Sequence, residues 1–265
     1  MDTSDIEWLK TIEPTKEEVE HLEWLIPEQR SKRGNFSVIG GDKNHITRVQ
    51  ETYSLLEAKK PASVNILVPK SWRKFLETNP NAHFTEADVS GGFALSAEAT
   101  IIERISRSDG TIFPGDLGRN SQTAQAIERA ILQTSAPIVL SGDSLELIPN
   151  LSLLDRKNTT LVCNFGQFQR LAMTAKITPA VVSDMPHLKA VEVLHELTSK
   201  YPASVVIRHF DWLIASRNGI VWRTRTKDDH FALSIGVVAL LWRTIEPQDY
   251  IKNTLILSTT FFTQE

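Results

Sequence analysis

Short apolar runs recur along this chain, and segments with helical periodicity separate them. Most of the residues inside each run are apolar and many are β-branched, without a strict alternation with polar residues, which is typical of strands buried on both faces. Strands that alternate with helices at this spacing indicate βαβ units and a parallel sheet covered by helices. The sequence therefore predicts an α/β fold with a central, mostly parallel sheet. The runs are Phe36–Ile39, Val64–Val68, Thr111–Phe113, Pro137–Leu140, Thr160–Val162 and Ser204–Ile207.

Residues 1–35 precede the first of these runs and have a helical pattern. Thr15 and Glu18 have the spacing of a capping box, in which each side chain bonds the backbone amide of the other residue. Pro27 is expected to end this helix. We expect residues 1–35 to pack as a helical preface on a single domain that spans residues 1–265.

Glycine beside a polar residue follows four of the predicted strands. Glycine permits tight turns and a close approach of the backbone to a ligand. The carboxyl ends of parallel strands form the edge of the sheet at which ligands bind. One such turn is common without any ligand, but four of them favour a rim built around a polar ligand. The turns are Gly40-Gly41-Asp42, Pro114–Gly118, Ser141-Gly142-Asp143 and Cys163–Gly166.

The last third of the chain departs from the alternation of strand and helix. Two runs, Asp211–Ala215 and Gly219–Thr224, flank the dipeptide Asn218-Gly219, which is a strong signal of a β-hairpin. An acidic pair, Asp228 and Asp229, then precedes an apolar helical face. Acidic residues at a helix start are stabilised by the helix dipole, and the same position suits a general base beside an anion-binding turn. The residues alone leave both interpretations open.

Composition and charge exclude several classes of protein. The 265 residues carry a formal net charge of −3, which argues against nucleic-acid binding. No apolar run approaches the ~18 residues of a transmembrane helix, and the acidic N-terminus is unlike a targeting signal, so we expect a cytoplasmic protein without a membrane partner. The single cysteine, Cys163, excludes an internal disulfide, and the histidines predict no metal site because their spacing does not suit one. We expect His187 and His195 at the surface.

Several stretches of the chain correspond to motifs of one known family. They are the Val38–Gly41 strand end, Phe113–Arg119, Pro137–Leu147, Val162–Leu171 and Thr226–Asp229, the last of which falls on a Gly-Thr-Gly-Asp signature. In this order the stretches resemble the ATP/ADP-dependent NAD(P)H-hydrate dehydratase family, a branch of the ribokinase-like superfamily. The likeness extends from about Ile12 to Thr260 and rests on segment order more than on identity.

This resemblance implies a ribokinase-like fold, a three-layer αβα sandwich with a central, mostly parallel sheet. It also implies a repair reaction in which ADP or ATP phosphorylates the hydroxyl group of NAD(P)H hydrate and phosphate is then eliminated. Its implied cofactors are the nucleotide and Mg²⁺, its partners are small-molecule nucleotides and dinucleotides, and its assembly is a homo-oligomer.

The resemblance further implies roles for the matching residues. Asp229 would be the catalytic base, and the amides of Lys227 and Asp228 would form an anion hole. The dinucleotide substrate would contact Gly115, Asp116, Gly118 and Asn164, and the nucleotide would contact Asp143, Arg208 and Asp228.

The chain departs from the family at both signature glycines, which are replaced by Thr226 and Asp228. A β-carbon limits close approach to an anion. Asp228 also adds a negative charge, and the repulsion between unit charges ~4 Å apart is about 4 kcal/mol at an effective dielectric near 20. Two other functions therefore stay open. One is a small-molecule kinase of the same superfamily with a different acceptor, and the other is a non-catalytic member that binds a nucleotide or nothing.

Overall fold

The computed structural model describes residues 6–147, 151–178, 181–182, 184–226 and 231–258. The chain divides into two compact units, one formed by residues 27–148 and the other by residues 1–26 together with 149–265. We call them the first unit and the second unit. The single domain over residues 1–265 stays a prediction.

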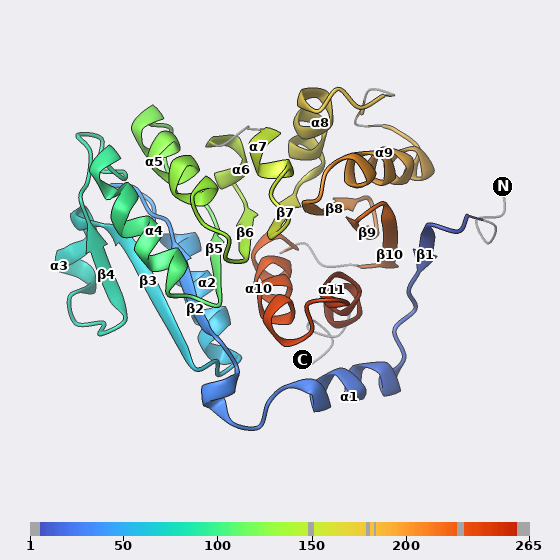
Figure 1. Cartoon of the computed structure of the whole chain (residues 1–265), viewed down its shortest axis with the longest axis horizontal. Coiled ribbons are helices and arrows are strands. Elements are labelled where there is room, and N and C mark those ends of the chain that lie inside the picture. Colours follow the sequence, from blue (N-terminus) through green and yellow to red (C-terminus); the bar gives the residue numbers. More distant parts are fainter. Residues whose placement is uncertain (1–5, 148–150, 179–180, 183, 227–230, 259–265) are drawn as a thin grey trace. The chain divides into compact units, whose positions relative to one another are not determined.

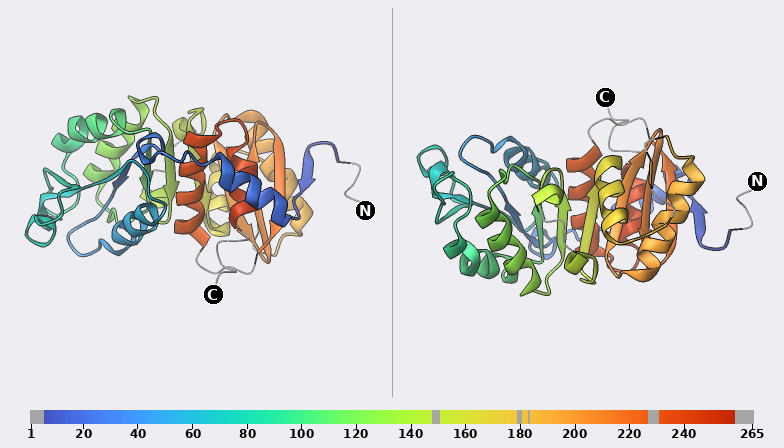
Figure 2. Two further views of the ribbon diagram at one scale, coloured as in Figure 1. Left: turned by 90° about the horizontal axis from the view of Figure 1, so that it is seen from below. Right: turned by 90° about the horizontal axis from the view of Figure 1, so that it is seen from above.

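The first unit contains five parallel strands in the order β6-β5-β2-β3-β4. Helix α2 covers one face of these strands, and α4 and α5 pack together on the other (Figures 1 and 2). The strands are β2 (Asn35–Ile39), β3 (Ser63–Pro69), β4 (Ala82–Thr85), β5 (Gly110–Phe113) and β6 (Ile138–Ser141). The helices are α2 (Thr47–Ala58), α3 (Arg73–Leu76), α4 (Glu98–Ser106), α5 (Ser121–Leu132) and α6 (Ser144–Leu147), with 3₁₀ turns η2 (Arg30–Lys32), η3 (Lys70–Trp72) and η4 (Leu95–Ala97).

The second unit contains β1-β10-β9-β8-β7, in which β8 and β9 and then β9 and β10 pair antiparallel. Helices α8 and α9 lie on one face, and α10 and α11 on the other, with α1 against α11 (Figure 1). The strands are β1 (Leu9–Thr11), β7 (Thr159–Cys163), β8 (Ser204–His209), β9 (Trp212–Arg217) and β10 (Ile220–Arg225). The helices are α1 (Lys16–Leu25), α7 (Leu151–Leu154), α8 (Phe165–Thr174), α9 (His187–Lys200), α10 (Phe231–Ile245) and α11 (Tyr250–Ser258).

Burial explains why the central strands could be predicted. Every residue of β5, β6 and β7 is buried, so both faces of these strands pack against helices. The covering helices bury residues at helical spacing, such as Ile101 and Ile105 of α4. The predicted fold, a mostly parallel sheet between two layers of helices, is confirmed.

Two local predictions are also confirmed. The Thr15 hydroxyl accepts from the Glu18 amide at 3.2 Å, and the Glu18 carboxylate accepts from the Thr15 amide at 3.1 Å. In the hairpin between β9 and β10, Asn218 and Gly219 have φ values of 51° and 76°. Positive values at both central residues are what a two-residue hairpin turn requires.

Two strands were not predicted from the sequence. Both β1, Leu9–Thr11, and β4, Ala82–Thr85, are short, and neither contains an apolar run. Each is an edge strand, since β1 pairs only with β10 and β4 only with β3 among the described strands. The apolar residues Leu255–Leu257 belong to the buried helix α11, and residues 259–265 lie outside the described residues. No helix in the described part of the chain is long and apolar enough to span a membrane.

Candidate functional site

In the first unit, the turns that follow β2, β5 and β6 bring a group of charged side chains together. We call this group the carboxylate cluster: Asp42, His45, Arg48, Asp116 and Asp143. Asp42 follows β2, Asp116 follows β5 and Asp143 follows β6, while His45 and Arg48 lie at the start of α2. The strand-end rim predicted from the sequence is therefore present for three of its four turns.

Glycines allow these three turns to pack closely. A β-carbon on Gly115 would overlap the Asp143 Oδ1 atom, and one on Gly142 would overlap the Arg48 guanidinium. Both glycines have positive φ, 124° at Gly115 and 61° at Gly142, where side chains are strained. The glycines thus bring the Asp143 carboxylate and the Arg48 side chain against the backbone of neighbouring turns.

Hydrogen bonds connect the turns to each other and to α2. The Asp116 amide donates to Asp143 Oδ1 at 2.8 Å, and the Arg48 amide donates to Asp116 Oδ2 at 2.7 Å. The side chain of Ile46, the N-cap residue of α2, has no oxygen that could accept a hydrogen bond from the first amides of the helix. Asp116 therefore caps α2 from the end of β5, and its negative charge lies where the helix dipole favours it.

Asp42 and His45 form a carboxylate–imidazole pair at the same edge. Asp42 Oδ1 accepts from the amides of Asn44 and His45 at 2.7 and 2.8 Å and lies 3.0 Å from His45 Nδ1. The hydrogen bond to Asp42 raises the pKa of His45 above 6.5, and the Coulomb attraction of Asp42, Asp116 and Asp143 adds to it. The Asp42 side chain is 14% exposed and the His45 side chain 65%. An exposed imidazole oriented in this way can give or take a proton.

The pKa of the Asp116 carboxyl group is also shifted. Burial raises the pKa of Asp116 above its ordinary value, and the hydrogen bond from the Arg48 amide lowers it in part. Neighbouring Asp143 also raises the pKa of Asp116. Carboxylates with raised pKa values at a sheet edge are candidates for binding or proton transfer.

In the second unit, Asn164 begins α8 directly after β7. Its side-chain oxygen accepts from the Gln167 amide at 2.8 Å, and the Gln167 side chain accepts from the Asn164 amide at 2.9 Å, a full capping box. The carboxamide oxygen of Asn164, predicted to contact substrate, is thus committed to the helix. Its NH₂ group has no partner among the described residues.

Five rings gather around the β8–β9 turn of the second unit, and we call them the ring stack: Phe165, His187, His209, Phe210 and Trp212. The His209 ring lies 4.3 Å from both the Phe165 and the Phe210 rings, and 6.2 Å from His187. His187 lies 4.9 Å from Trp212. Phe210 has a φ of 54° and is 65% exposed. An exposed aromatic face of this kind can stack on a nucleobase.

The two histidines of the ring stack are unusual because they lack partners. Neither ring nitrogen of His187 or of His209 has a hydrogen-bond partner in the described part of the chain. Burial, followed by the charge of Arg223, lowers the pKa of His187 to about 4, and burial lowers the pKa of His209. The prediction that His187 and His195 lie at the surface is wrong. Both are half-buried, and His195 stacks on Trp8 at 4.0 Å because α9 packs against the sheet.

The remaining predicted site residues lie in separate parts of the chain. Arg208 lies at the end of β8, and its Nε donates to the Phe210 carbonyl at 3.3 Å. Gly118 packs near Asp42, whose Oδ2 would lie 3.0 Å from a β-carbon there. Lys227, Asp228 and Asp229 lie outside the described residues. The roles of all of these residues stay predictions.

Four residues beside these predicted ones were missed: His45, Arg48, His209 and Phe210. A local signal existed for His45, because an aspartate such as Asp42 commonly accepts from the amides of the next few residues, as in an Asx turn. No local signal marks the other three, since their partners are 68 residues away for Arg48 or lie on separate elements for the rings.

No group of three His, Cys, Asp or Glu side chains that could hold a metal ion exists in the described part of the chain. Mg²⁺ bound with a nucleotide needs only one or two carboxylates, because the phosphates and water supply the other ligands. The oxygen-rich carboxylate cluster fits that requirement.

Comparisons with known proteins agree on the architecture. No family model matches the chain, and no curated protein matches it. A ribokinase-like superfamily protein from Enterococcus faecalis superimposes with a TM-score of 0.72 at 10% identity, over 98% of this chain and 89% of that one. The ADP/ATP-dependent NAD(P)H-hydrate dehydratase from Bacillus subtilis, co-crystallised with ATP/Mg²⁺, gives 0.60 at 13% identity, over 93% and 86%. Phosphomethylpyrimidine kinase from Clostridium difficile gives 0.52 at 10% identity, over 85% and 99%.

At these identities the superpositions show the fold and not an activity. They extend over 85–98% of the chain. The parallel strands, the antiparallel hairpin and the two layers of helices all occur in the structure. The chain therefore has the ribokinase-like fold.

Proposed function

We propose that this chain is a phosphoryl-transfer enzyme with a ribokinase-like fold, specifically a divergent ADP/ATP-dependent NAD(P)H-hydrate dehydratase. The observation that carries the proposal is the carboxylate cluster, in which three strand-end turns meet through the Asp116–Asp143 and Arg48–Asp116 hydrogen bonds. The segment order of the family and the superposition on the Bacillus subtilis dehydratase support it.

The proposed reaction has two steps. The hydroxyl group of the NAD(P)H hydrate attacks the terminal phosphorus of ATP or ADP, the bond to the leaving nucleotide breaks, and the hydroxyl proton passes to a base. The new phosphate ester then leaves as inorganic phosphate while the ring loses a proton and regains its double bond. Positioning and charge stabilisation do most of the work in such transfers.

Each predicted residue receives a role in this proposal. Asp229 takes the hydroxyl proton, and the amides of Lys227 and Asp228 hold the transferring phosphoryl group. Gly115, Asp116, Gly118 and Asn164 contact the dinucleotide, while Asp143, Arg208 and Asp228 contact the nucleotide. Mg²⁺, when bound with the nucleotide, neutralises phosphate charge.

Two groups that the sequence did not single out add to these roles. His45, held by Asp42 and exposed to solvent, is suited to exchange a proton with the bound hydrate or with the departing phosphate. Phe210, exposed beside Arg208, offers a face on which an adenine ring can stack.

The test is recovery of NADH absorbance when the purified protein is incubated with hydrated NADH, ADP or ATP, and MgCl₂. We expect nucleotide-dependent recovery that Asp229→Asn lowers by about 100-fold or more, as expected for loss of a general base. Glu77→Gln, a change at an exposed carboxylate outside the cluster, serves as the control and should keep the wild-type rate.

Absence of recovery with the wild-type protein would contradict the dehydratase assignment. Thermal stabilisation by ATP or ADP would then separate a kinase with another acceptor, or a nucleotide-binding protein, from a chain that binds neither nucleotide.

A further inference from the structure

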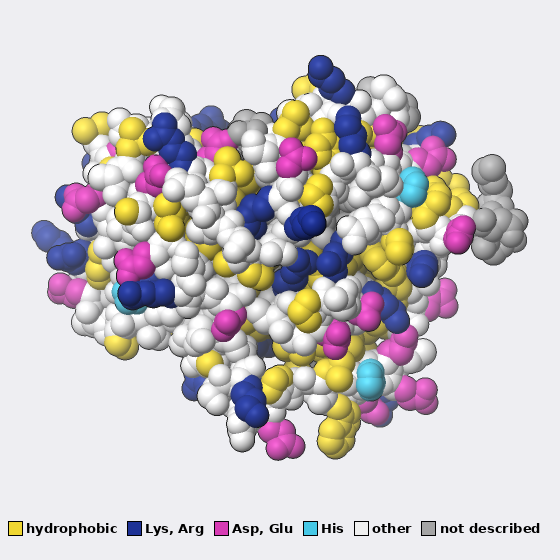
Figure 3. Space-filling model, viewed as in Figure 1, with side chains coloured by type: hydrophobic (Ala, Val, Ile, Leu, Met, Phe, Trp, Pro, Cys, Tyr) yellow, Lys and Arg dark blue, Asp and Glu magenta, His cyan; other side chains and the backbone are white. Residues whose placement is uncertain are grey.

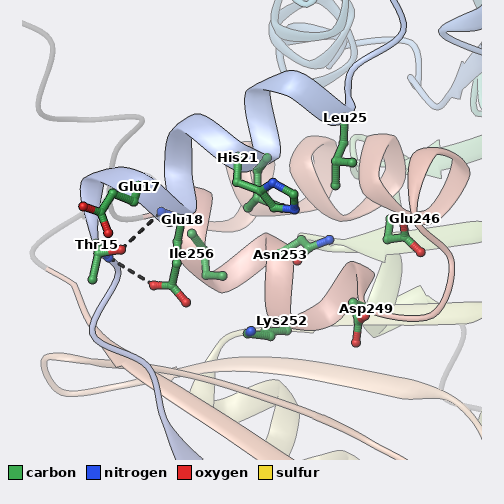
Figure 4. A pocket seen from close by; sticks show the side chains of 11 residues that line it. Thr15, Glu17, Glu18, His21, Leu25, Glu246, Asp249, Lys252, Asn253 and Ile256 are labelled. Carbon is green, nitrogen blue, oxygen red and sulfur yellow. Dashed lines mark hydrogen bonds between the residues drawn. The ribbon is translucent and has the colours of Figure 1, made fainter.

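A hollow of about 570 Å³ in the second unit is lined by α1, α11 and the turn between α10 and α11 (Figure 4). This volume is within the range of small-molecule sites. Its apolar lining comes from Leu22, Leu25 and Ile256, and its polar lining includes Thr15, Glu17, Glu18, His21, Glu246, Asp249, Lys252 and Asn253. None of these residues belongs to the carboxylate cluster or the ring stack.

Negative charge lies at both ends of this hollow. Glu17 and Glu18, at the start of α1, lie at one end, and Glu246 and Asp249, in the turn between α10 and α11, lie at the other (Figure 4). The side chains of Glu17 and Glu246 have no ion pair or hydrogen bond within the described residues. Lys252 is the cation among the lining residues. Figure 3 shows acidic side chains gathered over this part of the surface.

The side chain of Asn253 is the independent sign of a ligand. Asn253 is 5% exposed and lies in the middle of the hollow, between residues of α1 and of the α10–α11 turn (Figure 4). Its backbone amide bonds the Asp249 carbonyl at 2.9 Å, but its carboxamide has no hydrogen-bond partner among the described residues. The residue is thus mostly buried, and its carboxamide faces the hollow without a partner in the described part of the chain, so a ligand that enters the hollow can form a hydrogen bond with it.

We propose that this hollow binds a linear aliphatic polyamine. One ammonium group would lie between Glu17 and Glu18, and another between Glu246 and Asp249. The methylene chain would lie along Leu22, Leu25 and Ile256, and an N–H group would donate to the Asn253 carbonyl oxygen. An elongated cation matches this separation of charges by an apolar lining better than a compact ion does.

A second hollow extends the first and gives the ligand room for length. It shares Thr15, Glu18, Asp249 and Lys252 with the first hollow and continues along Lys10–Glu13 to Trp222. A longer polyamine could therefore extend past Glu18 along β1 without leaving protein surface.

The first experiment is a calorimetric titration of the full chain with spermidine at low and at high salt. We expect saturable one-to-one binding that weakens as salt rises, because exposed carboxylate–ammonium attraction is screened. Butylamine, which has the methylene chain but a single charge, should bind at least tenfold more weakly. Equal binding of butylamine, or no spermidine binding, would overturn the proposal.

Variants then locate the site. Asn253→Leu should lower the spermidine affinity at least tenfold through loss of a hydrogen bond to a charged group, and Glu246→Gln should lower it about two- to fivefold. Glu20→Gln is the matched control, since Glu20 lies on α1 but pairs with Lys16 at 3.4 Å. Thermal unfolding of each variant shows whether it is folded. If Asn253→Leu unfolds, Glu246→Gln keeps the test valid, because Glu246 is only partly buried and its side chain has no partner to lose within the described residues.

A magnesium chloride titration separates the organic cation from a metal. Binding of Mg²⁺ that competes with spermidine and is lost in Glu246→Gln would show a metal site and contradict the proposal. Spermidine binding that Glu246→Gln and Asn253→Leu leave unchanged would place the polyamine elsewhere and would contradict it too.

Discussion

The carboxylate cluster and the ring stack both lie at the carboxyl ends of strands, but they differ in whether their polar atoms form hydrogen bonds. In the carboxylate cluster, the oxygens of Asp42, Asp116 and Asp143 accept hydrogen bonds from backbone amides at 2.7–2.8 Å. In the ring stack, the four ring nitrogens of His187 and His209 have no partner among the described residues. One edge is thus held by directional bonds and the other by ring contacts.

Because of this difference, we expect the two regions to respond differently to mutations and to acid. Directional bonds between close turns tolerate little change in shape, since the packing relies on glycines with positive φ. Ring contacts tolerate shape changes better but require that the imidazoles stay neutral, because burial disfavours the charged form. Mutations should therefore disrupt the first region most, and acid should disrupt the second.

The largest effect is expected for Gly115→Ala. The added β-carbon overlaps Asp143 Oδ1 at a residue with a φ of 124°, so both a clash and backbone strain arise. We expect a loss of about 2–4 kcal/mol in the free energy of unfolding, measured by denaturant titration. The control is Gly166→Ala in α8, where the nearest atom would be 3.5 Å away, and it should be neutral or stabilising. Equal effects of the two variants would show that the turns pack loosely.

The next effect is acid destabilisation through His187. Its pKa is lowered from 6.5 to about 4 in the folded chain, so between these pH values the unfolded chain binds more protons. Stability should therefore fall as the pH falls from 6.5 to about 4 and level off below. Because the ring is only half-buried and partly screened by solvent, we expect a loss of about 1–2 kcal/mol.

His187→Phe isolates this contribution, since it keeps a stacked ring and removes the titrating group. Denaturant titrations across the same pH range should show a flatter profile for the variant. An unchanged slope would assign the acid sensitivity to other groups, such as His209.

A smaller effect is expected at Asp116, which caps α2 from the end of β5. Asp116→Ala removes the acceptor for the Arg48 amide and should lower the free energy of unfolding by about 1 kcal/mol. Asp116→Asn keeps an acceptor oxygen and should lower the free energy of unfolding by only a few tenths of a kcal/mol. If both variants lose the same amount, the charge of Asp116 rather than its hydrogen bond stabilises the helix.

The fold could be predicted because it depends on local patterns. Runs such as Ile138–Leu140 are apolar on successive residues, and their burial on both faces follows directly. The hairpin at Asn218-Gly219 and the capping box at Thr15 are set by residues within a few positions of each other. Strands β1 and β4 could not be found because a short edge strand has no distinctive pattern.

The candidate site could be predicted only in part. Glycine beside aspartate at a strand end is a local signal, and it located Asp42, Asp116 and Asp143 correctly on one edge of the first unit. The partner of Asp116, by contrast, is the Arg48 amide 68 residues earlier, and no local pattern reveals it. The ring stack combines residues from β8, β9, α8 and α9, so only the fold brings them together.

The smallest change is expected for Asp42→Asn, which tests the charge of the cluster without altering its shape. The carboxamide oxygen can still accept from the Asn44 and His45 amides, so the turn should persist. The pKa of His45, raised chiefly by Asp42, should fall towards 6.5, because the variant removes the charge that favours the imidazolium. An NMR titration of the His45 ring protons measures this directly, with Asp109→Asn, remote from the cluster, as the control. If the pKa of His45 does not move in Asp42→Asn, then Asp116 and Asp143 set it, and the imidazole responds to the whole cluster rather than to its nearest carboxylate.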